Sequence, residues 1–146
     1  MPPATSPSAD WPGRRLGLPE RGPRSIARGG RRLLAILLDW VLASAISIGF
    51  FPTNHGDLID RIVESNSFAT LGIFAVLQIL FIATLGGSVG HLVFGMRVVP
   101  LNPAWIGVFK PAARTVLLCL FIPAVIWDRD HRGLHDRLVG TVLVRR

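Results

Sequence analysis

The sequence predicts an all-α membrane protein with two transmembrane helices, a third short membrane or re-entrant segment, and a short β pairing on the cytoplasmic side. Two apolar runs, 33–51 and 68–85, match the ~20 residues that cross a bilayer core. Hydrophobic residues make up 50% of the 146 residues and charged residues 17%, whereas soluble domains carry roughly a quarter charged residues. This composition is too apolar for a disordered chain and too poor in charge for a soluble nucleic-acid binder.

The first region of the chain is basic and rich in proline and glycine. Residues 1–32 contain seven arginines and six of the eleven prolines. Such a segment buries too little apolar surface to offset the entropy of ordering. We therefore expect 1–24 to be a disordered tail and 25–146 to form the membrane domain. The apolar run that follows is too long for a secretory signal peptide, and no small-residue cleavage site closes it.

The two long apolar runs have the composition of transmembrane helices. Asp39 is the one charged residue in 33–51, and 68–85 has none. The alternative is that both are buried helices of a soluble protein, which their lengths disfavour.

A third segment is expected at about 112–127. Its apolar part, 115–127, spans 13 residues and contains Pro123, so it crosses the bilayer only if it extends back through Arg114. Otherwise it enters the membrane and returns as a re-entrant segment. The β-branched runs 96–99 and 141–144 can pair as strands if both lie on one side of the membrane, and this favours the re-entrant arrangement.

Arginine counts predict the orientation, because short loops rich in Lys and Arg remain cytoplasmic. Residues 52–67 hold Arg61 beside three acids, whereas 128–146 hold five arginines. We expect a multi-pass protein of the cell (plasma) membrane with a cytoplasmic N-terminus and an external 52–67 loop. The arginines of 128–146 favour a cytoplasmic C-terminus, whereas a full third span would place it outside.

The arginines of the tail predict a lipid partner. Near an anionic membrane surface each arginine contributes ~1 kcal/mol of attraction. We expect the N-terminal arginines to bind anionic lipids, and we expect no nucleic acid, because Trp11 is the tail's one aromatic residue and single-stranded nucleic acid needs interleaved aromatics.

Small residues surround an acid on one face of the first span. Positions four residues apart carry Ala35, Asp39, Ala43 and Ser47, a pattern that allows a second helix to approach closely. The second span offers Gln78 as a hydrogen-bond partner, together with four small residues: Gly72, Ala75, Ala83 and Gly86.

Asp39 is the strongest candidate for a functional residue. An ionised carboxylate inside a bilayer is costly, so it pairs with a cation, faces water or holds its proton. Arg32 precedes it by two helical turns, ~10 Å along the same face, and we expect Arg32 to lean inward as its partner. Arg97 and Arg114 are the alternative counter-charges.

Three motifs in order resemble the RDD family of membrane proteins, which is named for one arginine and two aspartates. The run 25–40 is similar to the family's first helix, so Arg32 and Asp39 match the arginine and the first aspartate. The run 88–99 looks like the segment after the second helix, although His91 stands where lysine or arginine is usual. The run 132–144 resembles the closing motif, so Asp136 matches the second aspartate, with His135 beside it. The runs 16–19 and 39–40 are similar to actinobacterial members.

The resemblance implies a membrane protein and, as one idea about the family, transport by cation/proton exchange. The first hypothesis is a small transporter in which Arg32, Asp39 and Asp136 form the candidate ion or proton site. Its supporting residues are Gln78, Arg97, Arg114 and His135. Three short membrane segments cannot enclose a pathway alone, so the transporter hypothesis requires a homo-oligomer or a membrane partner. The alternative is a structural or accessory membrane protein in which the Arg/Asp set fixes the fold.

No cofactor, metal or enzyme activity is expected. His131 and His135 are four residues apart near several acids, but arginines 129, 132 and 137 interleave with them and would repel a cation. The sequence also contains no phosphate-binding glycine loop and no arrangement of catalytic residues.

Overall fold

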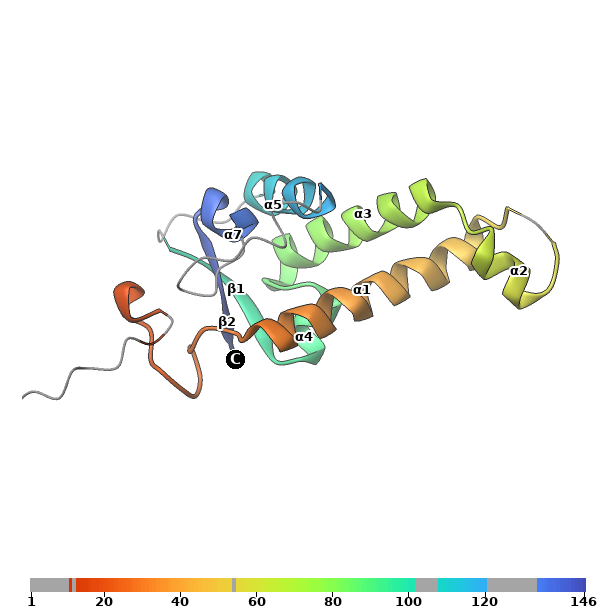
Figure 1. Cartoon of the computed structure of the whole chain (residues 1–146). Helices are drawn as coiled ribbons and strands as arrows, with labels where there is room; N and C mark the ends of the chain where they lie inside the picture. Colours follow the sequence, from red (N-terminus) through yellow and green to blue (C-terminus); the bar gives the residue numbers. More distant parts are fainter. Residues whose placement is uncertain (1–10, 12, 54, 102–107, 121–133) are drawn as a thin grey trace, which may run out of the picture.

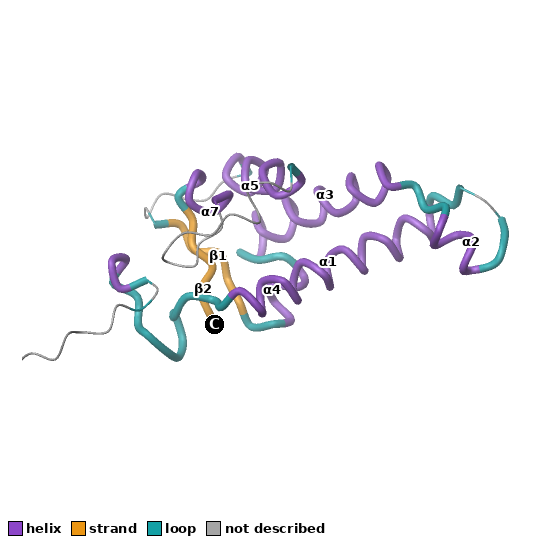
Figure 2. The backbone as a smooth tube through the Cα atoms, viewed as in Figure 1, coloured by secondary structure: helices purple, strands orange, loops and turns teal. Residues whose placement is uncertain are grey.

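The fold is a pair of long antiparallel helices with a small mixed unit at one end (Figures 1 and 2). It is seen in a computed structural model that describes residues 11, 13–53, 55–101, 108–120 and 134–146. The long helices are α1 (Gly29–Phe50) and α3 (Ser67–Leu85), which contact each other. The short helix α2 (Leu58–Val63) lies in the connection between them, at the end far from the C-terminus.

The mixed unit gathers segments that are far apart in the sequence. It contains a short helix after α3, a closing helix and two strands: α4 (Val89–Val93), α7 (Leu134–Val139), β1 (Met96–Pro100) and β2 (Thr141–Arg145). The helix α5 (Phe109–Cys119) packs on α3 and on α7. The mostly helical architecture and the small sheet agree with the predicted fold class.

Both long helices have the length and composition of membrane spans. At 1.5 Å per residue α1 is ~33 Å long and α3 ~28 Å, close to the ~30 Å thickness of a bilayer core. The rest of the protein buries only 22% of the apolar window in each helix, so large apolar side chains such as Leu37, Val41 and Val76 face outward. Helices in the core of a soluble protein would be mostly buried, and these exposed apolar faces match a hydrocarbon solvent instead.

The buried face of α1 is the predicted small-residue stripe, extended by one arginine. Its members are Arg32, Ala35, Asp39, Ala43 and Ser47. The opposing face of α3 differs from the prediction, because its buried residues are Thr70, Phe74, Gln78 and Ile82, while a Cβ on Gly72 would meet open space. The small side chains of α1 leave room for a large one on α3, and Phe74 packs with Ala43 and Leu118.

The helix α4 lies close against α1 at Gly90. A Cβ built on Gly90 would lie 2.2 Å from the Ala35 carbonyl oxygen, so only glycine fits between these two backbones. A capping box of Ser88 and His91 begins the helix at this point.

The predicted strand pairing is confirmed. β1 and β2 are antiparallel, with Val98 opposite Leu143. One face of the pair joins the core, where Met96, Val98 and Leu143 meet residues of α1 and α3. The other face carries Val142 and Val144, which Ile26 covers.

Residues 13–24 contact the sheet, which differs from the expectation of disorder for this part of 1–24. Leu16 and Leu18 cover Val142, Val144 and Ile26, and the backbone N–H of Arg24 donates to the Arg145 carbonyl at 2.9 Å. The 3₁₀ helix η1 (Arg14–Leu16) lies in this segment. The average composition of the segment did not predict these contacts, because only two leucines are needed to cover one face of a two-stranded sheet. Residues 1–10 lie outside the described residues.

The structure describes only the first part of the predicted third membrane segment. α5 has 11 residues, or ~16 Å of helix, which is too short to cross a bilayer core. Residues 121–127 of the predicted 112–127 segment lie outside the described residues.

The contact of Gly90 with Ala35 yields a prediction about stability. Gly90→Ala places a methyl group on the Ala35 carbonyl, so we expect thermal unfolding in detergent to show a loss of at least ~2 kcal/mol, in the range of overpacked cores. Gly72→Ala is the matched control, because its new Cβ meets nothing within 4 Å and alanine favours the helix. Equal stability of the two variants would contradict the close approach.

Candidate functional site

Two groups of buried polar side chains lie along the inner face of α1. The charge cluster comprises Arg32, Arg114 and Asp136, and the Asp39 cluster comprises Asp39, Gln78 and Ser88 with the backbone of Gly90. Arg32 and Asp39 are separated by two helical turns, ~10 Å along the axis.

Asp136 is the centre of the charge cluster and is fully buried. Its Oδ2 accepts from Arg32 Nη1 at 3.1 Å, and its Oδ1 accepts from Arg114 Nε at 2.5 Å. The guanidinium of Arg32 also donates to two backbone carbonyls, those of Ala27 at 3.0 Å and Leu143 at 3.3 Å. One carboxylate and two guanidiniums thus tie the beginning of α1 to α5, α7 and β2.

The position of Asp136 follows from local sequence as well as from its partners. It lies in the first turn of α7, where the helix dipole stabilises a negative charge. The turn that ends α7 contains Gly140, whose φ of 69° suits glycine. β2 begins directly after it, so the closing helix and the strand that receives Arg32 are held as one unit.

Asp39 is surrounded by neutral hydrogen-bond donors. Its Oδ2 accepts from Gln78 Nε2 at 2.9 Å and from Ser88 Oγ at 2.5 Å, and its Oδ1 accepts from the Gly90 N–H at 2.7 Å. These donors come from α3, from the N-cap of α4 and from α4 itself. The Asp39 carboxylate therefore fixes both α3 and α4 onto α1.

A hydrogen-bonded chain continues from Asp39 through Ser88 to His91. Ser88 Oγ lies 2.9 Å from His91 Nδ1, and the Ser88 backbone N–H donates to the same nitrogen at 3.1 Å. A ring nitrogen that accepts from a backbone N–H carries no proton, so the neutral imidazole is protonated on Nε2. His91 is 3% exposed, which makes it a second buried titratable group one hydroxyl away from Asp39.

The two clusters are electrostatically coupled through Arg114. This guanidinium bonds to Asp136 and its charge also acts on Asp39. Among the described residues, its Nη1 has no hydrogen-bond partner, and the same holds for three other buried polar atoms of α3 and α5: Thr70 Oγ1, Gln78 Oε1 and Thr115 Oγ1. The Gln78 amide donates to Asp39 through its nitrogen, so its unpartnered oxygen lies beside the carboxylate.

The structure corrects the predicted partner of Arg32. Its ion pair is with Asp136, 104 positions away in the sequence, rather than with Asp39. The carbonyls of Ala27 and Leu143 lie near the N-terminal end of α1. They accept hydrogen bonds from the Arg32 guanidinium and hold it at this end of the helix. Leaning inward along α1 would give up both of them.

The supporting residues are divided between the site and the surface. Gln78 and Arg114 belong to the two clusters, whereas Arg97 is exposed on β1. His135 lies in α7, while His131 lies outside the described residues. No group of three or more His, Cys, Asp or Glu in the described part of the chain is arranged to hold a metal ion.

Two residues of the site, Ser88 and His91, lie in the 88–99 run that resembles the family, but they were not among the predicted site residues. The spacing S-x-x-H satisfies the geometry of a capping box, but the usual signature has Glu or Gln in place of the histidine. That signature could have located the N-terminus of α4, but not the bond from Ser88 to Asp39.

The charge cluster yields a prediction about energetic coupling. Asp136→Asn leaves two buried guanidiniums without an anion and should cost ~3–5 kcal/mol. Arg32→Gln and Asp136→Asn should be non-additive, with a coupling of ~0.5–3 kcal/mol, whereas Arg32→Gln and Asp39→Asn should add to within ~0.5 kcal/mol. Reversible unfolding in mixed micelles measures both cycles. A larger coupling for Arg32 with Asp39 than for Arg32 with Asp136 would contradict the observed pairing.

Comparison with known proteins identifies the family of this chain. No curated protein and no solved structure matches the chain. The family model described as "RDD family" matches residues 26–140, a stretch that contains both clusters. The match covers most of the 146 residues, and the chain belongs to the RDD family.

Proposed function

We propose that this protein is a small multi-pass transporter of the cell membrane that exchanges protons for a monovalent cation. Membership in the RDD family and the two apolar helices indicate a membrane protein. The observation that carries the proposal is the setting of Asp39, a buried acid at the middle of α1 whose hydrogen-bond donors are all neutral.

The contrast with Asp136 supports a carrier role for Asp39. Two guanidiniums hold Asp136, and protonation of that carboxylate would leave two buried cations unbalanced. Asp39 receives amide, hydroxyl and backbone donors instead. A proton and a cation can therefore exchange on its carboxylate at a lower free-energy cost than on that of Asp136. Intramembrane acids with this freedom mark ion and proton pathways.

The oxygen atoms around Asp39 fit a small cation. Hard monovalent and divalent cations prefer carboxylate, carbonyl and hydroxyl oxygens. The Asp39 carboxylate, the Gln78 side-chain carbonyl and the Ser88 hydroxyl supply these types. Gln78 Oε1 is buried without a partner among the described residues, so a bound cation would satisfy an atom that is otherwise costly to bury.

The chain from Asp39 to His91 offers a route for the proton. Ser88 Oγ contacts both the carboxylate and the imidazole, and a hydroxyl accepts and donates a proton in one step. The His91 imidazole offers Nδ1 as the acceptor at the end of this chain. In this proposal Asp39 binds the ion, Ser88 relays the proton and His91 receives it.

Two long helices cannot enclose a pathway, so the proposal includes a homo-oligomer. The N-terminus is placed in the cytoplasm, where the arginines that precede α1 face anionic lipid. The exposed apolar side chains of α1 and α3 supply surface for lipid and for neighbouring subunits.

A structural or accessory role is the second candidate, and the charge cluster favours it. The ion pairs of Asp136 with Arg32 and Arg114 join three elements, α1, α5 and α7. If Asp39 serves only to hold α3 and α4 on α1, the whole Arg/Asp set fixes the fold and moves no ion.

Cation flux in proteoliposomes distinguishes the two candidates. We expect sodium or potassium gradients to drive a pH change inside vesicles that contain the wild-type protein, and Asp39→Asn to reduce it to the level of empty vesicles. Asparagine keeps an oxygen that accepts from the Gly90 N–H, and its Nδ2 can donate to the Ser88 hydroxyl oxygen or to the Gln78 side-chain carbonyl, so the variant should fold. Asp57→Asn is the matched control, because Asp57 is an exposed acid next to α2.

The opposite results have distinct meanings. Retained flux in a folded Asp39→Asn variant would remove Asp39 as the carrier. A wild-type protein that drives no cation-dependent pH change with either ion would overturn the transport proposal and favour the structural role.

A further inference from the structure

A basic pocket lies outside both clusters, between the C-terminal end of α3 and the strand β1. It has a volume of about 290 Å³ and is lined by Thr84, Leu85, Leu92, Met96, Arg97 and Arg146. A second cavity of about 350 Å³ adjoins it and shares Thr84 and Arg97, with Ile82 and Val98 among its apolar lining residues.

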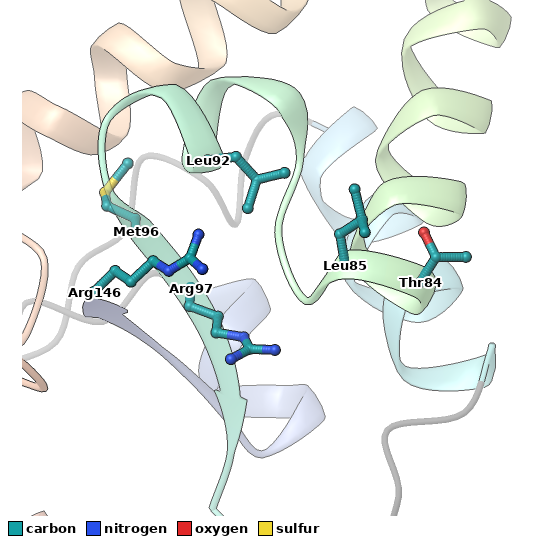
Figure 3. A pocket seen from close by; sticks show the side chains of 6 residues that line it. All are labelled: Thr84, Leu85, Leu92, Met96, Arg97 and Arg146. Atoms are coloured by element: carbon teal, nitrogen blue, oxygen red, sulfur yellow. The ribbon is translucent and has the colours of Figure 1, made fainter.

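Two guanidinium groups from different strands point into this pocket (Figure 3). Arg97 belongs to β1, and Arg146 follows β2. The antiparallel register brings them together, because Met96 pairs with Arg145 and the Arg146 backbone N–H donates to the Gly95 carbonyl at 2.8 Å. The pair of cations is therefore a consequence of the sheet, not of neighbouring positions in the sequence.

The backbone next to the pocket is shaped to admit the Arg97 side chain. Gly86 ends α3 with a φ of 73°, and a Cβ built there would lie 3.0 Å from Arg97 Nε. Its carbonyl accepts from the Val98 N–H at 2.7 Å. The guanidinium is thus held against the end of α3, while Arg97 as a whole remains exposed.

The electrostatics of the pocket call for an anion. No acid in the described part of the chain forms an ion pair with Arg97 or Arg146. Two like charges that converge on one space repel each other, and an anion between them removes that repulsion. A phosphate group can accept from both guanidiniums in the strong, charge-assisted geometry that arginine favours.

The surroundings of the pocket identify the source of that anion. The pocket lies at the end of α3, a helix long enough to span the hydrocarbon core. Leu85 and Leu92 line its wall, and Leu85 together with Val93 on α4 is exposed near it. A phospholipid places its phosphate at this depth and its acyl chains along such an apolar surface, which a free anion would leave uncovered.

We propose that this pocket binds the phosphate of an anionic phospholipid, with Arg97 and Arg146 holding the headgroup and Leu85 and Leu92 contacting the acyl chain. This site differs from the arginine-rich N-terminal segment, which attracts the membrane surface without a built pocket. It is independent of the transport proposal, because neither arginine belongs to the two buried clusters.

The test is native mass spectrometry of the full chain released from a neutral detergent, with added phosphatidylglycerol or phosphatidylcholine. We expect one tightly bound phosphatidylglycerol per chain, and we expect phosphatidylcholine to bind more weakly. The double variant Arg97→Gln/Arg146→Gln should weaken phosphatidylglycerol binding roughly 30-fold, as expected from the loss of two arginines that each attract anionic lipid. The variant Arg97→Lys/Arg146→Lys keeps the charge and should recover part of this loss.

The matched control is Arg15→Gln/Arg21→Gln, which removes the same charge from exposed positions outside the pocket. An equal loss of phosphatidylglycerol in this control would overturn the site, as would equal binding of both lipids by the wild-type protein. Complete competition by millimolar inorganic phosphate would show that the pocket holds a free anion and would also overturn the lipid assignment. The single variant Arg97→Gln, at an exposed position, gives the same readout if the double variant does not fold.

Discussion

The fold depends on one buried carboxylate, that of Asp136, which forms ion pairs with Arg32 and Arg114 at once. Arg32 stands at the beginning of α1, Arg114 in α5 and Asp136 at the beginning of α7. Removal of the anion would leave two cations in the interior, which costs far more than an intact pair contributes. These ion pairs therefore favour a single position of α7 and β2 against α1, although these elements are far from α1 in the sequence.

The first aspartate of the family motif, Asp39, has a different environment. Asp39 lies within the same face of α1, yet its donors are an amide, a hydroxyl and a backbone N–H. Arg114 links the two acids electrostatically, but its ion pair is with Asp136. We infer a division of labour in which Asp136 holds the fold and Asp39 is free to exchange the ion that it binds.

The elements set by local pattern were predictable from the sequence. Helix lengths, the small-residue stripe of α1 and the pairing of the strands follow from hydropathy and from periods of four and two residues. The partner of Arg32 was not predictable in this way, because Asp136 is 104 positions away and Asp39 lies on the same helix face. Ser88 and His91 were missed because their role arises only when the short helix α4 meets α1 at Gly90. The contacts of Leu16 and Leu18 escaped notice because proline and arginine dominate the composition around them.

The division of labour between the two aspartates is tested most directly by infrared difference spectroscopy of the protein in lipid nanodiscs after a pH step. Subtraction of the Asp39→Asn spectrum from the wild-type spectrum cancels the bands of the exposed acids. Our account predicts a protonated-carboxyl band that remains after this subtraction and therefore belongs to Asp39. A difference spectrum without such a band, over the pH range in which cation flux occurs, would contradict the assignment of the exchanged proton to Asp39.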